Sequence, residues 1–148
     1  MMATDFESAY QRLDEAAEFM CETRYQMSHR SAALLIRQGL EAGLWTFLCA
    51  QDELGDRTSF KSQFLIFNHY LWVFEQTETE IPDAVRDIHW TWVALSRASH
   101  VHGYPLPPVL MEVQRWERSV RVFLDWVQLH YCTPCKLPER GHTRSVWE

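Results

Sequence analysis

The sequence has no apolar run long enough to span a bilayer, because charges such as Arg37 and Glu41 interrupt every candidate. It also lacks an excess of basic charge: 14 Lys and Arg stand against 20 Asp and Glu, for a formal net charge of −6. This balance argues against a protein whose whole surface grips nucleic acid, although a local basic pocket remains compatible with it. The N-terminus shows no basic region followed by an apolar core, so we expect a cytoplasmic protein with no membrane partner.

Several motifs that carry well-defined chemistry are missing as well. The sequence has no glycine-rich phosphate loop, no His-Glu-x-x-His, and no paired Glu-x-x-His motifs of the kind that build a di-iron bundle. The His-x-Glu and Pro-Cys-x-x-Cys pattern of zinc deaminases is absent. No short basic recognition helix is present, which argues against a helix-turn-helix protein. We therefore expect no cofactor.

The four cysteines provide one candidate for a metal site. Cys132 and Cys135 form a Cys-x-x-Cys pair, which is half of a zinc site, and His130 and His142 could supply the other half. The spacing of this second pair is irregular, and without a secretory signal the thiols are expected to be reduced. We expect no bound metal here.

Hydrophobic periodicity predicts an all-α protein built as an up-and-down bundle of about five helices. The chain has 148 residues, which suits a single domain. We expect that domain to cover residues 1–131, with residues 132–148 as a C-terminal tail that shows no helical period. The predicted helices are about 5–26, 29–50, 59–74, 82–101 and 108–131.

Two features of the predicted second helix concern its neighbours. Gly39 and Gly43 weaken a helix relative to alanine, so their presence indicates close approach of another helix. Arg37 and Glu41 form an i,i+4 pair, which we interpret as part of a solvated face.

The predicted third helix is apolar around much of its circumference. Phe64, Phe67 and Phe74 follow one stripe, while Leu65 and Trp72 lie off it. A helix of this kind is either central or part of a subunit interface. We therefore predict a homodimer.

The end of the predicted fourth helix gathers most of the residues that could carry chemistry. Arg97 and His100 are three residues apart and share a helix face. Gly103 can adopt the left-handed conformation that ends a helix, which places His102 at the C-cap. A guanidinium beside imidazoles can hold a phosphate and move protons around it. The same residues could equally be a capping donor and an ion-pair partner, so both interpretations stand at this point.

Arginines also cluster on the predicted last helix. Arg115, Arg118 and Arg121 lie on faces other than its buried side, and Arg115 and Arg118 are neighbours. Nearby carboxylates offset their charge, so we interpret this patch as a solvated face.

Two segments resemble the HEPN superfamily, and in particular an actinobacterial subfamily of small uncharacterised HEPN proteins. They are RSAALLIRQGLE (30–41) and WVALSRASHVHGYPLP (92–107), and the resemblance extends over about residues 28–125. Many HEPN proteins are metal-independent endoribonucleases, often toxins or defence effectors, and they act as dimers that bring two motifs together. The resemblance matches Arg97 to the motif arginine and His102 to the motif histidine of an Arg-x4-His motif. His100 matches an additional histidine of the subfamily.

The resemblance implies a ribonuclease in which Arg97 and His102 are catalytic. His102 acts as general base or acid, and Arg97 stabilises the charge that builds on phosphorus. Ser99, His100 and Tyr104 are the candidate substrate-binding residues, and we expect Arg97, His100 and His102 to line one polar cleft. An antitoxin protein is then a candidate partner. The alternatives are a non-catalytic nucleotide- or partner-binding helical module and a purely structural dimer.

Overall fold

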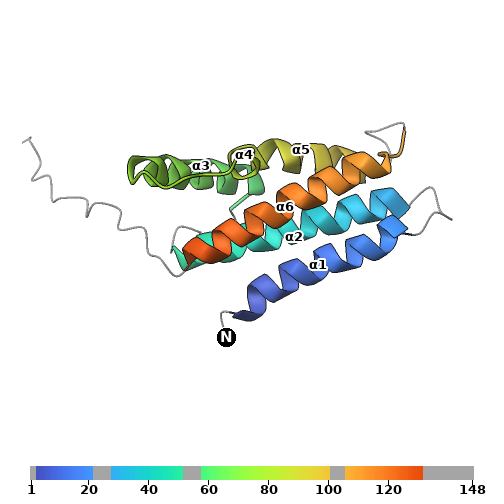
Figure 1. Cartoon of the computed structure of the whole chain (residues 1–148), viewed down its shortest axis with the longest axis horizontal. Helices are drawn as coiled ribbons and strands as arrows, with labels where there is room; N and C mark the ends of the chain where they lie inside the picture. The colour runs from blue at the N-terminus through green and yellow to red at the C-terminus, as the bar shows by residue number, and fades with distance from the viewer. Residues whose placement is uncertain (1–2, 22–27, 52–57, 101–105, 132–148) are drawn as a thin grey trace, which may run out of the picture.

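The computed structural model describes residues 3–21, 28–51, 58–100 and 106–131. These residues form helices and short connections, with no strand among them, and this confirms the predicted all-α class. Figure 1 labels six helices: α1 (Ala3–Cys21), α2 (Ser28–Ala50), α3 (Phe60–Gln76), α4 (Asp83–Arg86), α5 (Ile88–Ser99) and α6 (Leu110–Tyr131). The predicted tail, residues 132–148, lies outside the described residues.

The predicted fourth helix is in fact two helices. Asp87 adopts φ −93° and ψ 8°, which interrupts the α-helical geometry between α4 and α5. The described part of the chain therefore contains six helices where about five were expected. The bounds of α2, α3 and α6 fall within two residues of the predicted ones. The predicted end of the first helix, at about residue 26, lies outside the described residues. Ser59 caps α3 by accepting a hydrogen bond from the Ser62 amide at 3.2 Å.

The C-cap of α5 also differs from the expectation. The helix ends at Ser99, and His100 is its C-cap with an extended backbone at φ −89° and ψ 120°. The prediction that His102 is the C-cap was therefore wrong, and His102 itself lies outside the described residues. One physical reason is that the Ala98 carbonyl, which a further helical turn would engage, accepts a hydrogen bond from Arg30 instead.

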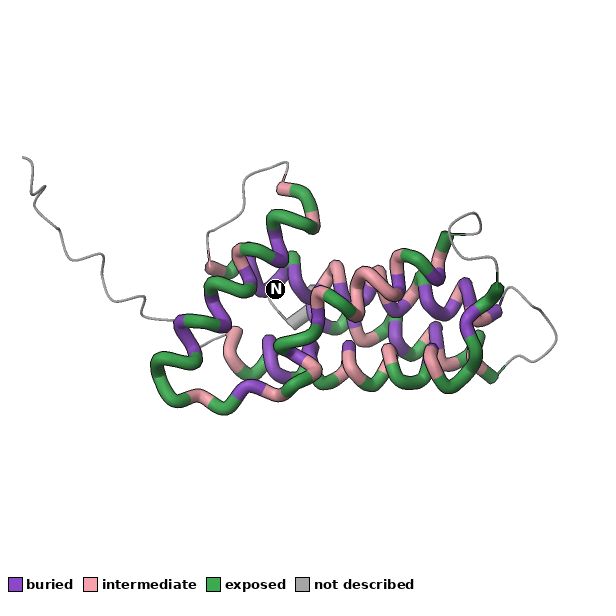
Figure 2. The backbone as a smooth tube through the Cα atoms, turned by 90° about the horizontal axis from the view of Figure 1, so that it is seen from above, coloured by how far each residue is buried: buried purple, intermediate pink, exposed green. Residues whose placement is uncertain are grey.

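The helices are arranged in three layers (Figure 1). α1 lies on one side of the pair formed by α2 and α6, and α3, α4 and α5 lie on the other side. α2 is the central helix, because it packs against α1, α3, α5 and α6. Along each helix, buried positions recur on one side, as the burial colouring of Figure 2 shows.

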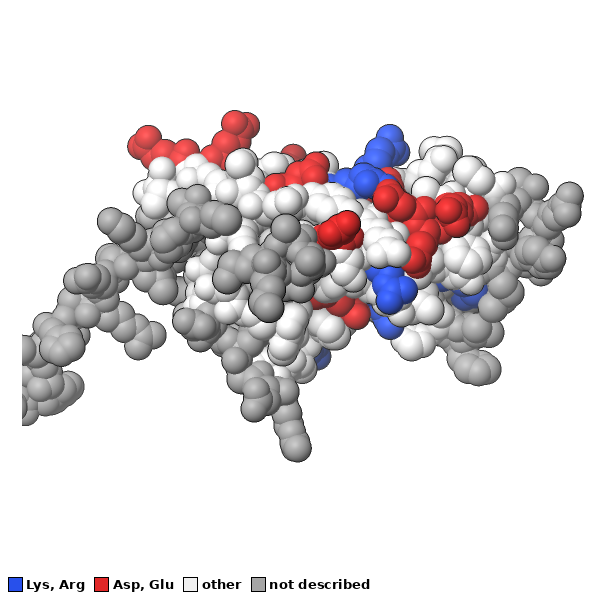
Figure 3. Space-filling view, turned by 90° about the horizontal axis from the view of Figure 1, so that it is seen from below, with Lys and Arg blue, Asp and Glu red and all other residues white. Residues whose placement is uncertain are grey.

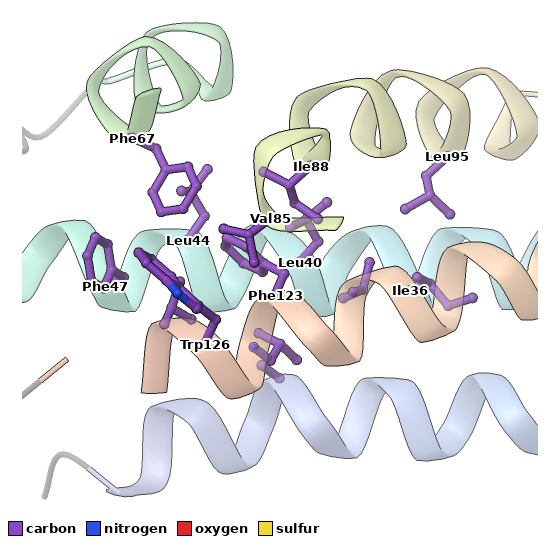
Figure 4. Close-up of a cluster of buried hydrophobic side chains, with 14 of the residues drawn as sticks. Ile36, Leu40, Leu44, Phe47, Phe67, Val85, Ile88, Leu95, Phe123 and Trp126 are labelled. Carbon is purple, nitrogen blue, oxygen red and sulfur yellow. The ribbon is translucent and has the colours of Figure 1, made fainter. Parts of the chain in front are cut away.

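The core is built from large apolar side chains of every layer. Figure 4 shows Leu40 and Leu44 of α2 meeting Phe123 of α6, with Val85 and Ile88 above them. Each of these five side chains is almost completely buried. The core thus joins α4 and α5 to the central pair, and it fixes where α5 lies relative to α6.

α3 attaches to this core through aromatic rings. Phe67 makes edge-on contacts with Phe47 of α2 and with Phe123 and Trp126 of α6. On the opposite side of α3, Leu65 is 70% exposed and Trp72 is 58% exposed. α3 is therefore peripheral, and its outer face carries apolar surface that no described residue covers.

The two glycines of α2 mark close helix contacts, as the sequence predicted. A Cβ atom at Gly39 would lie 3.0 Å from the carbonyl oxygen of Ala9 on α1. A Cβ atom at Gly43 would collide with Cδ2 of Leu124 on α6. The absence of side chains at these positions lets α2 approach both neighbours.

Polar contacts also join α1 to α6. The Tyr10 hydroxyl donates to Asp125 at 2.6 Å, and Arg121 donates to Asp14 at 3.1 Å and to Glu117. Burial, followed by the Asp125 carboxylate, raises the pKa of Tyr10 above its usual range. Arg121 is therefore a bridging residue, which corrects its interpretation as part of a solvated face.

Candidate functional site

The end of α5 presents two polar side chains to solvent. Arg97 lies in the last turn of the helix and His100 is its C-cap, and both are exposed. The described part of the chain provides no ion-pair or hydrogen-bond partner for either side chain. A guanidinium and an imidazole are thus available together beside a helix C-terminus, whose partial negative charge favours cations. His102 and Tyr104 lie outside the described residues.

A buried arginine on α2 holds the same helix end from the inside. Arg30 is only 8% exposed, and its Nη1 atom donates to the carbonyls of Ala98 at 3.4 Å and His100 at 3.3 Å. The neighbouring His29 ring contacts the Pro108 carbonyl through Nδ1 at 3.0 Å. The start of α2 therefore contacts both the end of α5 and Pro108, two residues before α6 begins.

Sequence reasoning assigned no role to Arg30. A signal was nevertheless present, because Arg30 lies about one turn before Ala33 on the core-facing side of α2. An arginine at such a position needs acceptors nearby, since a buried cation without hydrogen bonds is strongly unfavourable. The open carbonyls at a helix C-terminus are suitable acceptors.

Ser99, a predicted substrate-binding residue, takes part in the helix itself. Its hydroxyl donates to the carbonyl of Leu95 at 2.6 Å, and the residue is half-buried. The hydroxyl proton is thus engaged within α5, and only the oxygen lone pairs are open to another group. Of the five predicted site residues, the structure places Arg97, Ser99 and His100 together on the final turn of α5.

Arg37 and Glu41 are not part of a solvated face. Their side chains are 21% and 17% exposed, and the Arg37 Nε atom lies 3.3 Å from the Glu41 carboxylate. Trp92 of α5 covers the pair and donates from Nε1 to Glu41 at 3.0 Å. The solvated-face interpretation was wrong because an i,i+4 charge pair looks the same in sequence whether water or a second helix covers it.

The contact between α2 and α5 therefore carries a polar strip. On α2 it consists of Arg30, Arg37 and Glu41, and on α5 it runs from Trp92 to the C-cap His100. The Ser96 hydroxyl is buried and has no hydrogen-bond partner within the described residues. This strip fixes the position of α5 and leaves Arg97, on a different face, free to meet a ligand.

Charge elsewhere on the molecule is mixed. The face in Figure 3 carries carboxylates and basic side chains side by side, without a continuous basic surface. Within the described ranges, no three His, Cys, Asp or Glu residues gather to hold a metal ion. Cys132, Cys135 and His142 lie outside those ranges. None of the helices described combines the length and apolar character that crossing a membrane requires.

Comparison with known proteins gives no assignment. No family model matches the chain. No match was found among curated proteins or among solved structures.

Proposed function

We propose that this chain is a HEPN-like, metal-independent endoribonuclease of the toxin or defence type. The observation that carries the proposal is the end of α5, where Arg97 is exposed without a partner in the described residues and His100 lies three residues further on. Arg30 binds the open carbonyls of this helix end from the buried side. Arg97 is thus not needed as a cap and is available to bind phosphate.

The proposed reaction is transesterification within RNA. The ribose 2′-hydroxyl attacks the adjacent phosphorus, the bond from phosphorus to the 5′-oxygen breaks, and a cyclic phosphate and a 5′-hydroxyl are formed. His102 accepts the 2′-hydroxyl proton or donates one to the leaving oxygen, and Arg97 stabilises the charge on the phosphoryl oxygens. His100, Ser99 and Tyr104 bind the substrate.

Cleavage of labelled RNA in the presence of EDTA tests this proposal. We expect wild-type protein to cleave, and Arg97→Ala to lower the rate by about 10²–10³-fold, as for loss of one charge-stabilising group. Arg118→Ala removes another exposed arginine, from the surface of α6, and should leave the rate unchanged. Equal rates for wild type and Arg97→Ala would contradict the proposal.

We further propose that the protein acts as a homodimer whose interface includes the start of α6. There Leu106, Val109 and Met111 are 72%, 59% and 78% exposed. This apolar corner adjoins the end of α5, because His29 and Arg30 bind Pro108 and the α5 carbonyls respectively. The exposed face of α3 lies toward the opposite end of the molecule (Figure 1), so a dimer formed there would not bring two copies of Arg97 together.

Sedimentation equilibrium of two matched variants separates these surfaces. Met111→Lys places a charge in the corner beside the motif and should yield a monomer of about half the wild-type mass with impaired cleavage. Trp72→Lys places the same charge on the exposed face of α3 and should leave the mass and the cleavage rate unchanged. Dissociation by Trp72→Lys alone would assign the interface to α3, and a monomeric wild type would exclude the dimer.

The alternative function is binding without turnover, by a nucleotide- or partner-binding module in the cytoplasm. The engagement of Ser99 by the Leu95 carbonyl favours it, because this hydroxyl has no free proton to donate to a substrate in this arrangement. Binding of RNA that depends on Arg97, without cleavage under any condition, would support this alternative. An antitoxin-like partner protein fits the catalytic proposal, since an active ribonuclease must be restrained in its own cell.

A further inference from the structure

A groove of about 540 Å³ lies between the α4–α5 segment and α6. On one side it is lined by Asp83, Asp87 and Trp90, and on the other by Arg115, Trp116 and Ser119. The two walls run antiparallel along the molecule (Figure 1). A groove of this volume accommodates a small organic ligand.

The charges in the groove are separated along its length. Figure 4 places Phe123 of α6 beneath Val85 and Ile88. Because the walls are antiparallel, Arg115, about two turns before Phe123, lies about two turns further along α5, near Ala94. Asp87 precedes Ala94 by seven residues, or about 10 Å at the helical rise. One end of the groove is therefore acidic and the other end is basic.

The charged side chains of the groove have no ion-pair partner in the part of the chain that the structure describes. Asp83, Asp87 and Arg115 are exposed and form no ion pair within the described ranges. Between the two ends lies Trp90, a large aromatic side chain that is 68% exposed. An exposed indole between unpaired charges of opposite sign is a suitable surface for a flat ring that carries an anion at one end and hydrogen-bond donors at the other.

The basic end of the groove leads toward the candidate catalytic residues. Trp90, Ala94 and Arg97 succeed one another at helical spacing, four and three residues apart, and so share one side of α5. A phosphate near Arg115 would thus lie one helical turn from Arg97. On α5 the groove lining extends to Ala94, about one helical turn before Arg97 on the same side of the helix.

We propose that this groove binds a nucleotide of the RNA and selects guanine. The base stacks on Trp90, its Watson–Crick edge faces Asp83 and Asp87, and its phosphate lies toward Arg115. This inference rests on the proposed function for its choice of RNA as the ligand. The axial offset of about 10 Å between Asp87 and Ala94, near which Arg115 lies, is comparable with the length of a nucleotide from base edge to phosphate.

The choice of guanine follows from hydrogen bonding. An ionised carboxylate only accepts hydrogen bonds, so Asp83 and Asp87 favour a base edge that donates. Guanine presents two adjacent N–H donors that one carboxylate can accept together, whereas uracil presents one donor between two carbonyl oxygens. The carbonyl oxygens of uracil would face the carboxylate and repel it.

Isothermal titration calorimetry with guanosine and uridine 5′-monophosphates tests the inference directly. We expect wild-type protein to bind the guanosine nucleotide at least tenfold more tightly than the uridine nucleotide. The double variant Asp83→Asn, Asp87→Asn should bring this ratio close to one. Trp90→Ala should weaken both nucleotides by about tenfold through lost stacking.

Matched controls keep the result specific. Trp72→Ala removes the exposed tryptophan of α3, and Arg118→Ala removes an exposed arginine of α6 outside the groove lining; neither should change nucleotide affinity. Arg115→Ala should weaken both nucleotides. No measurable binding to wild type, equal affinities for the two nucleotides, or equal effects of Trp90→Ala and Trp72→Ala would overturn the inference.

The inference and the proposed function can fail separately. Arg97→Ala should lower the cleavage rate by about 10²–10³-fold while the guanosine-to-uridine affinity ratio persists. If the protein bound the nucleotides with this affinity ratio but did not cleave RNA, the proposed groove function would stand and the ribonuclease proposal would be refuted. RNA cleavage that depends on Arg97, without a preference for guanosine over uridine nucleotides, would support the ribonuclease and refute the nucleotide-selective groove.

Discussion

Two arginines meet at the end of α5 from opposite sides, and they differ in what surrounds them. Arg30 approaches from α2, is almost completely buried, and donates to the carbonyls of Ala98 and His100. Arg97 belongs to α5 itself, is exposed, and has no partner within the described residues. The inner arginine does the structural work of capping the helix end, which leaves the outer one available for a ligand.

The comparison shows how one helix end can be capped from within and still present an arginine to solvent. A helix C-terminus offers open carbonyls that attract any nearby cation. If the side chain of Arg97 or His100 had to donate to these carbonyls, its turning toward a phosphate would lower the stability of the fold. Because Arg30 satisfies two of them from the buried side, ligand binding and helix capping are separated.

Removal of the inner arginine should have the largest effect on stability. Arg30→Ala leaves the Ala98 and His100 carbonyls without this donor and removes a buried side chain. We expect a loss of about 2–3 kcal/mol in the free energy of unfolding, measured by urea denaturation. Arg97→Ala is the matched control and should change the same quantity by less than about 0.5 kcal/mol. Similar losses of unfolding free energy for the two variants would contradict the distinction between a structural Arg30 and an exposed Arg97.

A second pair sharpens the same contrast between covered and exposed charges. Glu41→Ala removes the acceptor of Trp92 and the partner of Arg37, in a place where both carboxylate and guanidinium are mostly covered. We expect a loss of about 1–3 kcal/mol in the free energy of unfolding. In the exposed pair Arg12–Glu15, Glu15→Ala should cost less than about 0.5 kcal/mol. An unchanged free energy of unfolding in Glu41→Ala would show that the polar strip does not stabilise the position of α5.

The smallest effect concerns a histidine at the end of α6. His130 packs against the rings of Phe74 and Trp126, and burial lowers its pKa below the ordinary value of 6.5. The unfolded chain then binds a proton more readily than the folded one, so stability is fully present above pH 6.5 and falls as the pH drops through the lowered value. Thermal denaturation at pH 7.5 and 5.5 should show a smaller acid-induced loss for His130→Gln than for wild type. An identical acid-induced loss of thermal stability in the two proteins would contradict the role given to His130.

Much of the fold could be predicted from the sequence, because hydrophobic periodicity locates the helices and the two glycines of α2 indicate close helix contacts. The break at Asp87 was missed, since the apolar stripe continues through it and only the backbone departs from the helix. The α5 C-cap was misplaced because Arg30, seventy residues earlier, takes part in ending that helix.

The candidate site was harder to predict for the same reason. Arg97 and His100 are three residues apart in the sequence, so spacing alone places them on one helix face. Three features depend on which helices pack together. They are the burial of Arg30, the hydrogen bond from Trp92 to Glu41, and the groove between Trp90 and Arg115. Sequence spacing within one helix carries no information on these contacts.

The central claim is that Arg97 serves a ligand and Arg30 serves the fold. The most direct test is the rate of RNA cleavage in EDTA by Arg97→Ala, on protein whose free energy of unfolding has been measured in the same preparation. The account predicts a rate about 10²–10³-fold below wild type with stability within about 0.5 kcal/mol of it. A wild-type rate, or a loss of activity that follows a loss of stability, would contradict the account.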